Sequence, residues 1–268
     1  TIYPSTVLCS QELKMIDTHC HINDEKFKDD IDDIISRSVD SGITKIICVG
    51  TDLKTSERAL NLSSIYDIVY ASVGYHPHES KDAENGYIYK LEEMTNNDKV
   101  VAIGETGLDY HYNLSPKNIQ KKIFMEQIEL AKNIDLPVVM HNRKSSTDLI
   151  KILDKMKLNH GVVHCFSEDW NIATRLLEMK IKLSFTGIIT FIKNPFCEVL
   201  KNISLDDFFI ETDSPYLSPI PLRGKRNEPS NIKHIAQYIA DLRKIPVEEI
   251  IENTSNNALK FFKKINSD

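Results

Sequence analysis

Several features are scarce or missing in this sequence, and each absence excludes a class of protein. No run of apolar residues is long enough to cross a bilayer, which takes about 20 residues in a helix. The first 14 residues lack the basic head and long apolar middle of a secretory signal. We therefore expect a soluble cytoplasmic protein, with the nucleus as the alternative location, and no membrane partner.

The cysteines form no recognisable pattern. They are odd in number, widely spread and without a C-x-x-C pair: Cys9, Cys20, Cys48, Cys165 and Cys197. This spacing argues against both a disulfide framework and a thiolate zinc site. We predict reduced thiols that pack as small apolar side chains. Strand alternation further predicts that Cys165 points away from its neighbour His164.

Positive charge is also in deficit. The net charge of −6 and the pI near 5.9 give no global attraction for nucleic acid. A polyanionic substrate would need bound cations or a local basic patch. One such patch is "PLRGKRNEP" at residues 221–229, where Arg223 and Arg226 flank Gly224. The alternative is that this run is only a solvated surface loop.

The chain does contain a regular alternation of strand and helix patterns. Eight short β-branched runs recur about every 30 residues, the spacing of a βα unit. They lie at residues 15–21, 44–50, 67–76, 99–106, 136–141, 161–166, 181–187 and 208–213. Their near-continuous apolar character suits parallel strands that are buried on both faces.

Eight βα units without a linker or a compositional shift predict one α/β domain. We expect a closed (β/α)₈ TIM barrel over residues 15–268, preceded by an N-terminal extension of residues 1–14. An open doubly wound sheet is the alternative, although no G-x-G-x-x-G follows the first run. The clearest helix should start at Ser115 as N-cap and Pro116 in the first turn, and end before Pro137. Two further helices are predicted over residues 231–244 and 247–265.

Side chains that bind metals recur where the predicted strands end, which is where barrel enzymes have their active sites. The first run carries His19 and His21, and residues two apart lie on the same face of a strand. Later runs add four more, so the full set is His19, His21, Glu105, His141, His164 and Asp213. Each alone has a structural explanation, such as a hydrogen-bonded core histidine.

Six ligands exceed the needs of one tetrahedral ion. They favour two divalent ions that share a bridging carboxylate and a water. Such a pair lowers the pKa of the water and holds both the attacking and the leaving oxygen of an in-line displacement. The predicted chemistry is hydrolysis, with phosphate esters as the natural substrate.

The motifs "IDTHCH", "VGYHPH", "IGETGLDY", "QIELAKNIDLPVVMHNR", "HCFS", "TGIITF" and "ETDSPYLSPIPLRGKRNEP" extend this hypothesis. Together the chain resembles the TatD family of metal-dependent deoxyribonucleases, within the amidohydrolase-like barrels, from about Met15 to its end. The resemblance implies 3′–5′ exonuclease activity on DNA with two divalent cations, Mg²⁺ first and Zn²⁺ or Mn²⁺ as alternatives. It implies no obligatory protein partner.

The resemblance also assigns roles to residues. His19, His21 and Asp213 would bind the first ion, His141 and His164 the second, and Glu105 would bridge them. As a carboxylate beside the ions, Asp213 is also the candidate general base. The predicted substrate-binding residues are His76, Arg143, Arg223 and Arg226, and the candidates for base stacking are Tyr75, Tyr110, Phe166 and Tyr216.

Two alternative functions fit the same residues. One is a metal-dependent hydrolase of a small amide or lactone, because the barrel and its histidines do not fix the substrate. The other is a non-catalytic protein that binds metal or DNA, which retention of every candidate ligand and of the candidate base disfavours.

Overall fold

A computed structural model describes residues 14–192 and 196–265, so residues 1–13 of the predicted extension and Cys9 lie outside the described residues. Eight parallel strands form one sheet in sequence order. The strands are β1 Met15–Cys20, β2 Ile43–Val49, β3 Val69–Val73, β4 Val100–Asp109, β5 Val138–Arg143, β6 Gly161–Val163, β7 Ile181–Phe185 and β8 Phe208–Ile210. All eight predicted strands are confirmed.

The sheet curves until its first and last strands meet. The backbone N–H of Asp213 donates to His19 O at 2.9 Å, and that of His21 donates to Ser214 O at 2.7 Å. The segment after β8 is thereby joined to the end of β1. The predicted (β/α)₈ barrel is therefore confirmed, with its closure beside the first pair of histidines.

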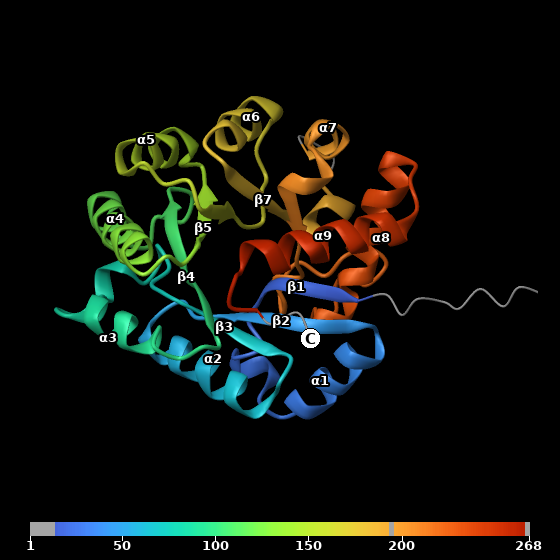
Figure 1. The fold of residues 1–268 in the computed structure, drawn as a ribbon, viewed down its shortest axis with the longest axis horizontal. Helices are drawn as coiled ribbons and strands as arrows, with labels where there is room; N and C mark the ends of the chain where they lie inside the picture. Colours follow the sequence, from blue (N-terminus) through green and yellow to red (C-terminus); the bar gives the residue numbers. More distant parts are fainter. Residues whose placement is uncertain (1–13, 193–195, 266–268) are drawn as a thin grey trace, which may run out of the picture.

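Helices surround the strands (Figure 1). They are α1 Ile31–Asp40, α2 Leu53–Ile65, α3 Tyr87–Met94, α4 Lys117–Asn133, α5 Ser146–Met156, α6 Trp170–Glu178, α7 Phe196–Asn202, α8 Ile232–Arg243 and α9 Val247–Phe261. Among the described residues, no helix combines the length and apolar character that crossing a bilayer requires.

The predicted start of α4 needs one correction. Pro116 is the N-cap residue, and no side chain caps the helix. Ser115 instead turns its hydroxyl to the loop after β3, donating to His78 O at 2.7 Å and accepting from the Lys81 N–H at 3.0 Å. The side chain that was expected to cap a helix therefore ties down the loop that carries His76 and His78.

The core has two parts, one between strands and helices and one inside the barrel. The inner part combines inward-facing strand residues, such as Ile47 and Phe209, with Phe261, Phe262 and Ile265 from the end of α9 and beyond. His160, which precedes β6, contacts Phe261 O at 3.2 Å. The amino end of the barrel is thus filled by apolar side chains, and the carboxyl end is left for polar groups.

Candidate metal centre

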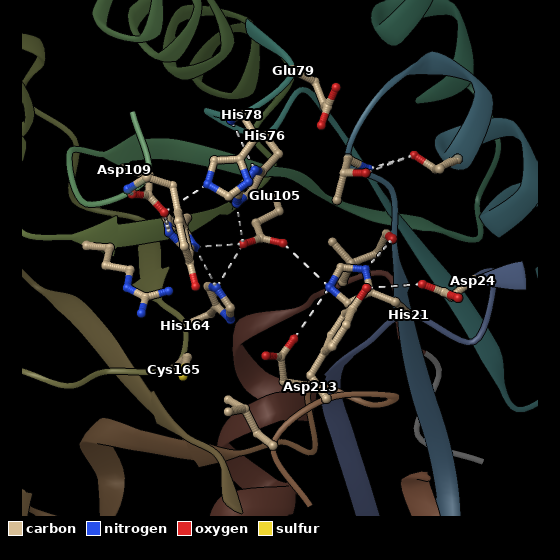
Figure 2. A pocket seen from close by; sticks show the side chains of 18 of the residues that line it. His21, Asp24, His76, His78, Glu79, Glu105, Asp109, His164, Cys165 and Asp213 are labelled. Carbon is tan, nitrogen blue, oxygen red and sulfur yellow. Dashed lines mark hydrogen bonds and ion pairs between the residues drawn. The ribbon is translucent and has the colours of Figure 1, made fainter. Parts of the chain in front are cut away.

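A cavity of about 940 Å³ opens at the carboxyl end of the barrel. Its lining includes His21, Glu105, His141, His164 and Asp213. His19 lies beneath them, with no exposed surface. The structure therefore brings all six predicted ligands together, although they come from strand ends far apart in the sequence. Figure 2 labels four of them, His21, Glu105, His164 and Asp213.

Four donor atoms form the first half of the centre. His19 Nε2 and His21 Nε2 lie 3.3 Å apart, and Glu105 Oε2 is 3.5 and 3.6 Å from them. Asp213 Oδ1 is 3.8 and 3.4 Å from the same two nitrogens. Donors around a tetrahedral ion with bonds of 2.0–2.2 Å are separated by roughly 3.3–3.6 Å. This half fits one divalent cation.

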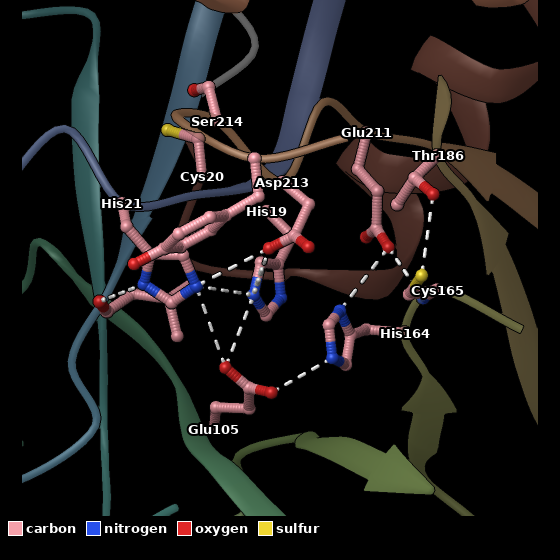
Figure 3. Close-up of polar contacts among 12 residues, drawn as sticks. His19, Cys20, His21, Glu105, His164, Cys165, Thr186, Glu211, Asp213 and Ser214 are labelled. Carbon is pink, nitrogen blue, oxygen red and sulfur yellow. Dashed lines mark hydrogen bonds and ion pairs between the residues drawn. The ribbon is translucent and has the colours of Figure 1, made fainter. Parts of the chain in front are cut away.

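Three donor atoms form the second half. Glu105 Oε1 is 2.8 Å from His164 Nε2 and 3.1 Å from His141 Nδ1, and the two nitrogens are 3.3 Å apart. Figure 3 shows Glu105 between His21 on one side and His164 on the other. Because each oxygen of Glu105 faces a different half, the carboxylate has the orientation that a bridging ligand needs.

Strand geometry explains only part of this arrangement. His19 and His21 share a face because they are two residues apart, as predicted. β6 ends at Val163, however, and Cys165 has a left-handed φ of 46°. Strand alternation, on which the prediction that Cys165 points away from His164 rested, therefore does not hold here; Cys165 lines the cavity and its Sγ lies 3.3 Å from Thr186 Oγ1. Burial raises the pKa of its thiol to about 12, so it remains protonated at neutral pH.

Asp109, a residue that the sequence analysis did not single out, supports the second half from behind. Its Oδ2 lies 3.2 Å from His141 Nε2 and 2.9 Å from His78 Nε2. Its Oδ1 accepts the backbone N–H groups of His111 and Tyr112 at 2.9 and 2.8 Å. A proton on His141 Nε2 is thereby favoured, which leaves Nδ1 free to bind a cation.

Glu211 has a similar place behind His164. Its Oε1 accepts the backbone N–H of Cys165 at 2.7 Å and lies 3.5 Å from His164 Nδ1, which is an ion-pair contact rather than a hydrogen bond. A signal for both acids was present in the sequence. Asp109 follows Glu105 at an even spacing on β4, and Glu211 precedes Asp213 by two residues, so each pair could share a strand face.

His76 reaches the centre as a hydrogen-bond donor. Its Nδ1 accepts the backbone N–H of His78 at 3.1 Å, which places the ring proton on Nε2. Nε2 lies 3.3 Å from Glu105 Oε1. Burial lowers the pKa of His76 to about 4, so the ring is neutral at pH 7. Its Nε2–H can donate to Glu105 or to an oxygen bound beside it.

The charges of the carboxylates and imidazoles around the centre favour the binding of a cation. Burial by itself raises the pKa of Glu105, but the surrounding imidazoles, His164 first, hold it well below its usual range. The pKa of Asp213 is likewise lowered by His21 despite its burial. Burial lowers the pKa of His164, but Glu105 outweighs burial and raises it well above 6.5. Two ionised carboxylates among crowded imidazoles are groups that divalent cations bind, with proton release.

The predicted arginines separate into two groups. Arg143 lines the cavity, where its guanidinium lies 4.6 Å from the centre of the Tyr112 ring. Arg226 pairs with Asp30 and lies 4.6 Å over the Phe27 ring. Arg223 lies over Phe191 at 3.8 Å and donates to Ser218 O. The structure does not bring Arg223 and Arg226 to the cavity, because both are held by groups of the barrel rim.

The predicted stacking aromatics also separate. Tyr75 and Phe166 are buried, and Tyr110 donates its hydroxyl to Asp148 at 2.9 Å. Tyr216 lines the cavity and is 46% exposed. Tyr112, which sequence reasoning missed, also lines it and is 54% exposed. The aromatic rings available to a ligand are therefore Tyr112 and Tyr216.

Known proteins resemble this chain over nearly its whole length. The model of the family described as TatD related DNase matches residues 16–263. An uncharacterized metal-dependent hydrolase of Bacillus subtilis, YabD, is 41% identical, covering 93% of this chain and 99% of that protein. An uncharacterized metal-dependent hydrolase of Escherichia coli, YcfH, is 34% identical, covering 92% of this chain and 95% of that protein. The solved structure of YJJV, a TatD homologue from Escherichia coli, is 30% identical with a TM-score of 0.88, covering 93% and 98%.

Proposed function

Because this chain belongs to the TatD family of metal-dependent hydrolases, we propose that it hydrolyses phosphodiester bonds of DNA at a centre of two divalent cations. The observation that carries the proposal is the orientation of the Glu105 carboxylate. Its Oε2 faces the first half of the centre and its Oε1 faces the second. Removal of single nucleotides from a 3′ end rests on the family resemblance alone.

The residues that would hold the cations are His19, His21 and Asp213 in one half and His141 and His164 in the other, with Glu105 between. Bound cations supply an acidified water and neutralise charge on the phosphate. Asp213 is the base candidate, because its ionised carboxylate lines the cavity and can accept a proton from that water.

Two side chains would position the substrate. His76 presents its Nε2–H beside Glu105 Oε1, where it can donate to a phosphate oxygen without adding charge. Arg143 can hold a neighbouring phosphate, because guanidinium binds phosphate in a bidentate manner. Arg223 and Arg226 would contribute only to substrate that extends over the rim.

The candidate ligands include groups that suit different cations, so the identity of the cation is a matter for experiment. The two carboxylates suit Mg²⁺ and Mn²⁺, whereas the four imidazoles suit Zn²⁺ better. We propose Mg²⁺ as the first candidate, with Zn²⁺ and Mn²⁺ as alternatives.

The test is cleavage of single-stranded oligonucleotides labelled at the 5′ or the 3′ end, after chelation and reloading with each cation in turn. The proposal predicts a ladder of products shortened from the 3′ end that Asp213→Asn does not produce. No cleavage with any of the three cations would exclude the DNase function. Cleavage only of internal bonds would exclude the exonuclease part.

One observation favours a second candidate, a hydrolase of a small uncharged substrate such as an amide or lactone. Besides the candidate ligands, Asp24, Glu25 and Glu79 line the cavity. Their negative charge opposes entry of a polyanion. Hydrolysis of small amides or lactones by the reloaded protein, without cleavage of oligonucleotides, would favour this candidate.

A further inference from the structure

Positive charge is scarce in the cavity. Of the residues that the structure describes, two with a permanent positive charge line it, Arg58 and Arg143. Arg58 belongs to α2, which follows β2, whereas Arg143 ends β5. Strands β3 and β4 lie between them in the barrel. The two guanidinium groups therefore approach the cavity from different parts of its rim.

Arg58 is held by a pair that it can leave. Its Nη2 lies 2.5 Å from Glu25 Oε1, and the Glu25 side chain is 62% exposed. Exposed pairs of this kind contribute little to stability. The other oxygen of Glu25 lies 4.0 Å from Lys28 Nζ. Glu25 would thus keep a counter-charge if Arg58 turned to another anion.

Arg226, in contrast to Arg58, is held by several contacts within the protein. It donates to both oxygens of Asp30 and to the backbone oxygen of Lys26, and it covers the Phe27 ring. Leaving these partners would cost several hydrogen bonds and a stacked contact. Arg58 has a single carboxylate partner at an exposed site, so its guanidinium is much the easier of the two to redirect.

The cavity continues from the metal centre to Arg58. Thr51 and Thr55, at the start of the helix that carries Arg58, also line it. The Thr55 side chain is occupied, because it completes the capping box of α2 with Asp52. Of the described lining residues with a permanent positive charge, Arg58 is the one that belongs to this helix, and the acidic residues Asp24 and Glu79 of the same cavity disfavour anions that no cation binds.

From this placement we infer that Arg58 binds a backbone phosphate of the substrate, one that is not the scissile phosphate. The inference rests on the proposed function, because it needs a substrate with more than one phosphate. A guanidinium in place of an ammonium group suits this role, since its paired N–H groups match two phosphate oxygens. Arg143 would hold the strand on one side of the scissile bond and Arg58 on the other.

The test measures binding rather than turnover. The probe is a fluorescently labelled single-stranded DNA oligonucleotide, titrated by anisotropy with Ca²⁺ as the only divalent cation and at several salt concentrations. The proteins are the parent, Arg58→Ala, Arg58→Lys and Glu25→Gln. Lys263→Ala is the matched control, because it removes one positive charge and one exposed ion pair, with Asp135, outside the cavity.

We expect Arg58→Ala to raise the Kd by roughly fivefold to tenfold and to lower the log-log salt slope by about 0.7. Arg58→Lys should recover part of the loss. Glu25→Gln should lower the Kd, because it removes both a competing partner and a negative charge. Lys263→Ala should stay within about twofold of the parent.

Three results would overturn the inference. Arg58→Ala could bind DNA as the parent does, it could lose affinity no more than Lys263→Ala, or it could lose cation binding or thermal stability in proportion to DNA binding. The proposed function is judged separately by cleavage of the same oligonucleotide with Mg²⁺. If the parent binds through Arg58 without cleaving, the proposed function fails, and Arg58 is a phosphate contact of bound DNA that is not a substrate. If it cleaves while Arg58→Ala binds normally, the proposed function stands and the inference fails.

Discussion

The two halves of the candidate metal centre differ in how completely the protein surrounds them. The first half has four protein donors, from His19, His21, Glu105 and Asp213, whereas the second has three, from Glu105, His141 and His164. Structural metal sites are closed and catalytic sites keep a position open for water or substrate. We therefore predict that a cation in the first half would be retained and that one in the second would exchange.

The two halves also differ in the groups that contact the outer ring nitrogens of the histidines, and here the second half has more carboxylates. In the second half, carboxylates stand behind both histidines, Asp109 behind His141 and Glu211 behind His164. In the first half, His21 Nδ1 contacts the backbone oxygen of Val49 and no carboxylate stands behind His19, although among the described residues His19 Nδ1 and His164 Nδ1 alike have no hydrogen-bond partner. A half with fewer ligands therefore depends more on groups that orient each ligand.

The largest expected effect is that of Glu105→Ala, which removes a donor from both halves at once. We expect loss of cation binding in both halves and a fall in activity of roughly a thousandfold or more, because the cations would supply both the nucleophile and the charge neutralisation. Metal content of the purified variant, by mass spectrometry, is the measurement. The isosteric Glu105→Gln controls for a cavity. Two cations retained by Glu105→Ala would show that another residue bridges.

Asp213→Asn should come next, with a fall in kcat of about 10²–10⁴-fold. An amide cannot accept the water proton, although its oxygen can still face the first half. Cation content at saturating metal should change little, and circular dichroism should show an intact barrel. Single-turnover rates within a few-fold of the parent would remove Asp213 from the role of base.

Asp109→Asn should separate the halves. Loss of the carboxylate behind His141 should weaken the second cation by about 10–100-fold while leaving the first at parental affinity. Calorimetric titration of the chelated protein resolves the two binding steps. Asp30→Asn, which alters a carboxylate on the outer rim, is the control and should change neither step. Equal weakening of both cations would mean that Asp109 supports the whole site.

The smallest expected effect is a difference in pH dependence. Burial first, and then His164, lower the pKa of His19, so it has no proton to lose at neutral pH. Burial lowers the pKa of His141 and His164 as well, but in these two residues Asp109 and Glu105 respectively outweigh it and raise the pKa.

A cation in the second half must therefore displace protons, and its affinity should fall first as the pH is lowered from 8 towards 6. In the first half only His21 has a raised pKa. Titration in buffers of different ionisation enthalpy counts the released protons. Parallel loss of both cations with falling pH would contradict the distinction.

Much of the fold and of the ligand set could be predicted from the sequence. The eight runs are short, apolar and regularly spaced, and parallel strands covered on both faces, as in a closed barrel, bury all of them. Six metal-binding side chains at their ends then had to meet at one rim. The errors arose where the chain leaves regular structure, because strand alternation says nothing about Cys165 beyond the end of β6, and Ser115 had a loop partner outside its own helix.

The sequence by itself determined the set of candidate metal ligands, since a strand end places a side chain on a rim whatever the neighbouring loops do. Only the tertiary structure decided which charged side chains line the cavity. Arg226 looked like a phosphate ligand because of its neighbours in the chain, but Asp30 and Phe27, nearly 200 positions away, hold it. Arg58 had no motif around it, yet the barrel sets it beside the cavity. Pairing between distant residues has no local signature, so those assignments needed the folded chain.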